Sequence, residues 1–387
     1  GMLTLDSARG FQVYEHPASL RAFPSYYEKI RDLLRQHVER QSSSLATRAA
    51  LGWKYLKNGL HNLNRIPELL PIREAGAAFS GCSAIILIPG PSLDRNIKKL
   101  QSMQEGIFII AVDSALQVCQ AHGLVPDFCI SIDPQTQVNA HTFTWHNAHT
   151  WHICSITAHP ETLRFPVTFL SLNTHPIAQA LEELYPAISG SVDSKTGTVA
   201  GDAIRFAAHA GFSQVIVAGL DFSFPGYSIY STDSQYQRTY RTRCNRIHTV
   251  QTMNMNYIMK SSGGLREKGL YTRKSFLQYR DTMVSLMNEM PCTVYHAAGN
   301  GLPLTGIADM QLDDFLHTYC HVTLNKKAMM RKTVSGISPL KKHISLDHVK
   351  DVLGNREIRT RIIEASLHNP GNMLLQRATE YYTRLTG

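Results

Sequence analysis

Two turns rich in glycine and hydroxyl side chains have the composition of an anion-binding site. Gly90-Pro91-Ser92 follows the apolar run 84–88, and Lys195-Thr196-Gly197-Thr198 directly precedes a helical pattern at 199–210. Glycine lets backbone N–H groups approach a phosphate, and the partial positive charge of a helix N-terminus favours the anion. Ordinary helix capping by Ser92 and Thr198 would require the same residue types. Neither turn is a P-loop or a G-x-G-x-x-G fingerprint, but two such helix starts suggest a nucleotide or a nucleotide sugar.

Three aspartates stand where apolar runs end. Asp113 follows 107–112, Asp133 follows 128–132, and Asp221 follows 215–218 in Gly219-Leu220-Asp221. Carboxylates at strand ends can hold ribose hydroxyls, a base amine or Mg²⁺. Each aspartate alone would also suit a helix N-cap or a turn, and Asp221 is either catalytic or structural. Two aspartates at successive strand ends favour a site.

The segment 227–246 is rich in tyrosine and arginine and poor in aliphatic residues, which is typical of a lid. Its Tyr230, Tyr236 and Arg241 have phenol and guanidinium groups suited to a leaving phosphate or an acidic sugar. A solvated basic loop is the alternative. His248 follows closely and has the chemistry of a general base. A run of histidines at 141, 146, 149, 152 and 159 matches no zinc spacing, so no metal site is expected.

The elements that would position these residues alternate between short apolar runs and helical patterns. Apolar runs occur at 84–88, 107–112, 128–132, 151–156, 167–172 and 215–219. Strands that are apolar throughout must be covered on both faces, which intervening helices achieve in a parallel sheet. We therefore expect an α/β, Rossmann-like fold with a mostly parallel sheet flanked by helices. Ligands of such sheets bind outside the carboxyl ends of the strands, so both glycine turns should converge on one crevice.

The two ends of the chain lack the alternation of short apolar runs and helical patterns. Helical periodicity predicts an N-terminal helical region at 2–75, the Rossmann-like core at 76–312, and a basic C-terminal helical region at 313–387. The helical ends could serve as a lid, as a dimer arm in a homo-oligomer, or as a docking surface for a partner.

Composition excludes several classes of protein. The 387 residues are 43% hydrophobic and 18% charged, which argues against a disordered chain. The longest apolar runs are about six residues, whereas a membrane span needs about 20, and no signal peptide is expected. The net charge of +9 suits an anionic ligand but is spread along the chain, without a nucleic-acid-binding motif. Seven scattered cysteines without C-x-x-C favour a reducing cytoplasm.

Several ordered segments resemble one family. IPGPSLDRNIKKL (88–100), IFIIAVDSAL (107–116) and GLVPDFCISIDPQ (123–135) resemble the core of motility accessory factors and of MptE-like 6-hydroxymethylpterin pyrophosphokinases. TGTVAGDAIRFAAHAGFSQVIVAGLDFSF (196–224) and AAGNGLPLTGI (297–307) are similar to its later segments. The core is also distantly similar to bacterial sialyltransferases that use CMP-sialic acid. Two departures are Leu220, where the family often has Gln, and Asp113, where sialyltransferases more often have Asn.

The resemblance implies a glycosyltransferase that moves a nonulosonic (sialic-acid-like) sugar from a CMP donor to protein Ser/Thr, such as flagellin. Asp133, Asp221 and His248 would then be catalytic. Gly90, Pro91, Ser92, Asp113, Thr196, Gly197 and Thr198 would hold the nucleotide. No cofactor would be required. Two alternatives stay open: an ATP-dependent pterin pyrophosphokinase using Mg²⁺, and a non-catalytic nucleotide-binding scaffold in motility.

Overall fold

The computed structural model describes residues 14–337, except 146, 174, 176, 177, 180, 181, 184, 185, 298 and 321–323. Of residues 35–50 it describes only the backbone. The part of the expected C-terminal helical region beyond residue 337 lies outside the described residues.

The core is a nine-stranded sheet in the order β1-β6-β5-β4-β3-β2-β7-β10-β11. Every neighbouring pair is parallel. The strands are β1 (Leu70–Pro71), β2 (Ser83–Leu87), β3 (Phe108–Val112), β4 (Phe128–Ser131), β5 (Trp151–Ser155), β6 (Val167–Ser171), β7 (Gln214–Ala218), β10 (Thr293–Ala297) and β11 (Ala308–Met310). The Rossmann-like α/β fold expected from the alternating pattern is confirmed.

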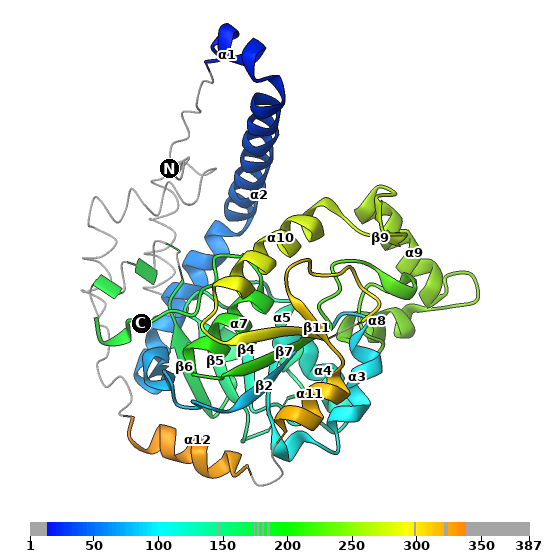
Figure 1. Ribbon diagram of the computed structural model, residues 1–387. Coiled ribbons are helices and arrows are strands. Elements are labelled where there is room, and N and C mark those ends of the chain that lie inside the picture. Colours follow the sequence, from blue (N-terminus) through cyan, green and yellow to red (C-terminus); the bar gives the residue numbers. More distant parts are fainter. Residues whose placement is uncertain are drawn as a thin grey trace.

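Helices enclose this sheet (Figure 1). They are α1 (Pro17–Ala22), α2 (Pro24–Asn62), α3 (Leu93–Leu100), α4 (Leu116–Ala121), α5 (Val138–Thr142), α7 (Val199–His209), α8 (Gln235–Arg243), α9 (Val250–Ser262), α10 (Lys274–Glu289), α11 (Leu312–Tyr319) and α12 (Lys326–Ser335). α7 buries Ala203, Phe206 and Ala207 and packs against β2, β3 and β4. Figure 1 shows α2 extending away from the sheet, with α1 at its far end. A short antiparallel pair, β8 (Arg266–Glu267) and β9 (Leu270–Tyr271), lies after α9.

The direction of strand addition reverses between β2 and β7. The chain adds β3, β4, β5 and β6 on one side of β2, and then returns to place β7 on the other side. Open α/β sheets bind ligands at such a switch point, outside the carboxyl ends of the strands. The turns after β2 and β7 flank this position, which directs attention to Gly90 and Asp221.

Aromatic side chains fill the core at the opposite, amino edge of the sheet. Phe108, Phe128 and Trp151 begin β3, β4 and β5, and the ring of Phe128 contacts Phe206 at 5.1 Å and Trp151 at 5.9 Å between centroids. Phe79 stacks on Phe212 at 5.4 Å. Rings packed in this way bury a large apolar area and contribute strongly to stability.

A buried ion pair attaches α12 to the same edge. Lys326 Nζ donates to Asp127 Oδ2 at 2.8 Å and to the Ile107 carbonyl oxygen at 3.0 Å. Asp127 Oδ2 also accepts the Ile109 N–H at 2.8 Å. The two buried charges neutralise each other, so α12 is fixed to the core.

Two regions differ from the sequence-based picture. The N-terminal region, expected to be helical to residue 75, contributes β1 to the sheet beside β6. The segment 227–246, expected to be irregular, contains α8, which begins with Ser234 accepting the Gln237 N–H. This helix lacks an apolar face. It is held by its N-cap and by side-chain hydrogen bonds of Gln237 and Arg238 to other elements.

Candidate functional site at the carboxyl edge of the sheet

The Gly90-Pro91-Ser92 turn is closed by acceptors of the protein itself. The Ser92 N–H donates to Asp221 Oδ2 at 2.9 Å, and the Gly90 N–H donates to the Gly219 carbonyl oxygen at 3.1 Å. The Leu93 N–H donates back to the Gly90 carbonyl oxygen at 3.0 Å. Asp221 is 5% exposed, and burial raises the pKa of its carboxyl group while the bonds from Ser92 lower it. An internal carboxylate therefore occupies the place at the start of α3 where an anion was expected.

Glycine is required where the β2 and β7 turns meet. A Cβ atom at Gly90 would lie 2.2 Å from the Gly219 carbonyl oxygen, and one at Gly219 would lie 1.8 Å from the Ile88 carbonyl oxygen. Gly219 also has φ +83°, which L side chains rarely adopt. The two turns are consequently locked together at the switch point.

Two further segments cover this junction. A Cβ atom at Gly301 would lie 2.6 Å from Asp221 Cα, so the segment 297–307 passes directly over the aspartate. The Ser231 N–H donates to the Pro89 carbonyl oxygen at 2.8 Å. Three of the segments that carry the family resemblance, 88–100, 196–224 and 297–307, thus contact one another around Asp221.

Asp113 and Asp133 lie close together at the ends of β3 and β4. Asp113 is 3% exposed, its Oδ1 accepts the Ser114 N–H at 2.6 Å, and its buried Oδ2 has no hydrogen-bond partner among the described residues. Burial raises the pKa of Asp113 to about 7, and the nearby charge of Asp133 adds to this rise. Burial also raises the pKa of Asp133, against hydrogen bonds from Gln135 and the charges of Lys54 and His159. Asp113 can therefore exchange a proton near neutral pH, beside a second carboxyl group whose pKa is raised above its usual range.

A stacked tyrosine pair faces these carboxyl groups. The rings of Tyr230 and Tyr236 lie 4.6 Å apart with an angle of 12° between their planes. Burial raises the pKa of Tyr236, and the charges of Asp133 and Asp113 raise it further, which places the phenol within electrostatic range of both. The buried ring of His141 lies 5.6 Å from Tyr236, and burial lowers the pKa of His141 to about 4.

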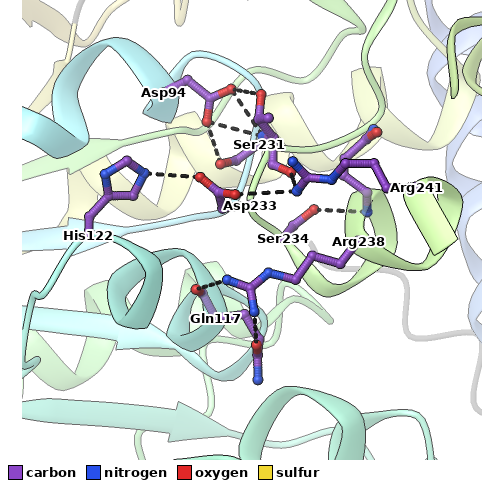
Figure 2. A network of polar contacts seen from close by, with 10 residues as sticks. Asp94, Gln117, His122, Ser231, Asp233, Ser234, Arg238 and Arg241 are labelled. Atoms are coloured by element: carbon purple, nitrogen blue, oxygen red, sulfur yellow. Dashed lines mark hydrogen bonds and ion pairs between the residues drawn. The ribbon is translucent and has the colours of Figure 1, made fainter.

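Arg241 is engaged in the network that holds the segment 231–243 in place. Its guanidinium donates to the Thr232 carbonyl oxygen at 2.5 Å and to Asp233 Oδ1 at 3.3 Å (Figure 2). His122 binds the other oxygen of Asp233 at 3.2 Å. Figure 2 also shows Asp94 accepting hydrogen bonds from the segment that begins at Ser231. In this conformation Arg241 supports the segment, and its contact with a phosphate stays a prediction.

The second turn acts as a cap for α7. Thr198 Oγ1 accepts the Gly201 N–H at 3.2 Å and bonds Thr196 Oγ1 at 2.9 Å. Thr196 Oγ1 in turn bonds Ser194 Oγ at 2.8 Å, and Ser194 Oγ donates to Asp202 Oδ1 at 2.6 Å. α7 connects β6 to the parallel β7, so this turn lies at the same edge of the sheet as Gly90. Gly197, at φ +72°, provides the bend; whether one ligand bridges both turns stays a prediction.

α2 docks on the carboxyl ends of β4 and β5, a contribution that the sequence analysis missed. Asn58 Nδ2 donates to the Pro134 carbonyl oxygen at 2.9 Å and to that of Thr157 at 3.3 Å. Asn62 Nδ2 donates to the carbonyl oxygens of Ile156 at 2.8 Å and Ala158 at 3.0 Å. The signal was available: Lys54, Lys57, Asn58, His61 and Asn62 recur at three- and four-residue steps, which places polar groups on one helix face.

A cavity of about 610 Å³ opens beside the carboxylates. It is lined by Asn139, Thr142, Phe143, Trp145, Asn147, His159, Glu161, Arg164, Phe165 and Pro166. The His159 N–H donates to the Asp133 carbonyl oxygen at 3.2 Å, so one residue borders both the cavity and the carboxyl pair. Cavities of this size, with aromatic walls and a few polar groups, suit small molecules.

His248 lies in the exposed connection between α8 and α9. Its N–H donates to Asn245 Oδ1 at 2.8 Å, and its role as a base stays a prediction. Within the described part of the chain, no group of three or more His, Cys, Asp or Glu side chains could hold a metal ion. His146, one member of the histidine run, lies outside the described residues.

None of the described helices is long and apolar enough to cross a membrane.

Together the fold and the site define an α/β protein with a polar, carboxylate-bearing edge at its switch point. Residues 57–226 match the family model described as 6-hydroxymethylpterin diphosphokinase MptE-like. This match confirms the resemblance inferred from the sequence and covers β1 to β7, including Gly90, Asp113, Asp133 and Asp221.

Two individual proteins are similar to this chain. An uncharacterized protein of Treponema pallidum (strain Nichols) is 35% identical over 113 residues, which make up 29% of this chain and 53% of that protein. The structure of MAf glycosyltransferase from Magnetospirillum magneticum AMB-1 superposes with a TM-score of 0.48 at 14% identity, covering 83% of this chain and 55% of that one. The chain thus spans about half the length of each of these two proteins.

Proposed function

We propose that this chain is a glycosyltransferase that uses a CMP-linked nonulosonic sugar and modifies a protein hydroxyl group, such as that of a flagellin Ser or Thr. The observation that carries the proposal is that Asp113 and Asp133, at the ends of neighbouring parallel strands, lie within electrostatic range of Tyr236 and of Lys54 on α2. This arrangement combines groups that accept a proton with groups that stabilise a departing phosphate.

Asp133 is the base that the geometry favours in such a transfer. The bond between the anomeric carbon and the phosphate oxygen breaks, and its electron pair leaves with CMP. The acceptor oxygen bonds the anomeric carbon, and its proton passes to the Asp133 carboxylate. A raised pKa makes this carboxylate a better base near neutral pH.

The remaining predicted residues have supporting roles. Gly90, Pro91 and Ser92 border the nucleotide, Asp113 contacts the nucleoside, and Thr196, Gly197 and Thr198 complete the donor pocket. Tyr230 and Tyr236 cover the sugar. Asp221 acts through Ser92, whose N–H it accepts, and so positions the turn rather than the substrate. The cavity beside His159 offers room for the acceptor.

A diphosphokinase acting on a pterin alcohol is the second candidate, favoured by the same carboxyl pair and by the family match. Mg²⁺ is often held by one or two carboxylates together with substrate phosphates. Asp113 and Asp133 fit this role, because Oδ2 of Asp113 lacks a partner among the described residues. The ion would neutralise charge on the phosphates during transfer.

A thermal-shift comparison of CMP, CDP, UDP and ATP, with and without Mg²⁺, tests the proposal. A ligand at 100 times its Kd should stabilise the protein by about 2.7 kcal/mol. Stabilisation by CMP without Mg²⁺ supports the transferase, and stabilisation by ATP only with Mg²⁺ supports the diphosphokinase.

Asp133→Asn should then abolish turnover of a CMP-sugar. Asp281→Asn, at a 58% exposed side chain on α10, is the matched control. Full turnover by Asp133→Asn would contradict the assigned base. Nucleotide binding by the wild type without turnover of any donor would support the scaffold instead.

A further inference from the structure

The face of α2 that meets the sheet edge carries two lysines and a histidine. Lys54 lies one turn before Asn58, and Lys57 lies one turn before His61, so all four occupy adjacent positions on the helix surface. The bonds from Asn58 to Pro134 and Thr157 fix this face within one or two residues of Asp133 and His159. Both lysines are exposed on the helix surface.

The electrostatic effects within this cluster agree with its geometry. Burial lowers the pKa values of His61 and His159, and the charge of Lys57 lowers both further. The charge of Lys54 opposes the rise in the pKa of Asp133. These mutual effects place two lysines, two histidines and one carboxylate at the same spot.

Polar atoms in the cluster are left for a ligand. Nδ1 of His61 is buried without a hydrogen-bond partner among the described residues. Lys54 makes no hydrogen bond or ion pair with any described residue. The excess of positive over negative groups favours an anion at this position.

Several of the other groups expected to bind an anion are already engaged. Asp221 accepts the Ser92 N–H at the start of α3, and Thr198 caps α7. Arg241 is bound to Asp233 and to the Thr232 carbonyl oxygen. Beside Asp133, positive charge is supplied by Lys54 of α2.

We infer that Lys54, Lys57 and His61 of α2, with His159 from the turn after β5, form an anion subsite for an oxyanion of the substrate. The subsite rests on the proposed function, because it lies beside the proposed base. Its ligand chemistry is a phosphate or a carboxylate, and in a CMP-linked acidic sugar both groups occur. The charges hold the anion and stabilise it as the phosphate departs.

Binding measurements by calorimetry with four probes test this subsite: CMP, cytidine, N-acetylneuraminic acid and inorganic pyrophosphate. In the double variant Lys54→Ala/Lys57→Ala we expect CMP and pyrophosphate to bind at least ten-fold more weakly, with cytidine changed less than two-fold. Added salt should weaken CMP binding to the wild type more than to the double variant. A ten-fold loss for N-acetylneuraminic acid alone would assign the subsite to the sugar carboxylate.

Lys98→Ala/Lys260→Ala is the matched control, because both lysines are exposed, on α3 and α9, and their loss changes the net charge equally. Equal weakening by this control, or unchanged affinities for all anions in Lys54→Ala/Lys57→Ala, overturns the subsite. Unfolding temperatures within about 2 °C of the wild type confirm that the variants are folded.

Failure of the subsite and of the proposed function are distinguishable. CMP binding that does not depend on Lys54 and Lys57 leaves the function standing without the subsite. Pyrophosphate binding that depends on both lysines, without CMP binding, leaves the subsite standing without the function. Absence of binding by every probe overturns both.

Discussion

The two edges of the sheet are built from the same strands but have opposite chemistry. At the amino edge β3, β4 and β5 begin with Phe108, Phe128 and Trp151, whose rings pack together. At the carboxyl edge the first two of these strands lead to Asp113 and Asp133, whose pKa values are raised by burial. The amino edge gains stability from packed rings and pairs its buried Asp127 with Lys326, whereas the carboxyl edge leaves Oδ2 of Asp113 without a partner among the described residues, at a cost in stability.

Each of these strands is at most five residues long. Even so, one end contributes to stability and the other end carries the candidate functional groups. Buried carboxyl groups with unsatisfied oxygens are unfavourable unless a ligand or a proton compensates them. Ring packing at the amino edge provides stability that offsets the cost of these buried carboxyl groups. Substitutions at the two edges should therefore act on different measurable quantities.

The largest effect is expected from Phe128→Ala at the amino edge. Phe128 is fully buried and contacts the rings of Phe79, Phe206 and Trp151. Its truncation should lower the free energy of unfolding by about 3–5 kcal/mol, measured by chemical denaturation. Affinity for CMP, measured well below the transition, should stay within about two-fold; a selective loss of affinity would break the separation of the edges.

A smaller loss, about 3 kcal/mol, is expected from Lys326→Ala, since it leaves Asp127 buried without its cation. Lys326→Met combined with Asp127→Asn should recover part of this loss, because no unpaired charge is then buried. Denaturation curves of the three proteins test this. Equal stability of Lys326→Ala and the wild type would show that α12 is not fixed to the core by this pair.

An effect of opposite sign is expected from Asp113→Asn at the carboxyl edge. The pKa of Asp113 is about 7 in the folded protein against a usual 3.8, so the folded state holds the proton more tightly. Its favourable contribution is present below about pH 4 and is lost as pH rises through about 7. Three pKa units correspond to at most about 4 kcal/mol.

Asp113→Asn should consequently be more stable than the wild type at pH 8, and the difference should shrink toward pH 4. Denaturation at pH 4.5, 6 and 8 measures this trend. Asp202, whose pKa is also raised to about 7, contributes the same slope to both proteins and cancels in the comparison. A pH-independent difference would mean that Asp113 is already ionised at neutral pH.

Much of the core was predictable because its pattern is local. The apolar run 84–88 became β2 at Ser83–Leu87, and the run 128–132 became β4 at Phe128–Ser131, because strands covered on both faces must be apolar throughout. The position of Asp113 and Asp133 followed from the rule that parallel strands share a carboxyl edge.

What the sequence could not provide depends on tertiary contacts. Nothing local to Ser92 indicates that Asp221, 129 positions later, takes its N–H. Nothing local to Lys54 indicates that α2 docks beside Asp133. The tertiary fold brings such residue pairs together. The pattern of a single sequence does not indicate which distant residues will be close in space.

The hydrogen bond from the Ser92 N–H to Asp221 changes how the strand–turn–helix segment at Gly90 should be understood. A G-P-S turn is commonly taken as a receptor for ligands, yet here the protein caps the helix start with its own carboxylate. Because Asp221 and Gly219 accept the N–H groups of Ser92 and Gly90, the turn holds the start of α3 against the end of β7. The residues that determine ligand specificity should then be sought on α2, which packs on the carboxyl ends of the neighbouring strands β4 and β5.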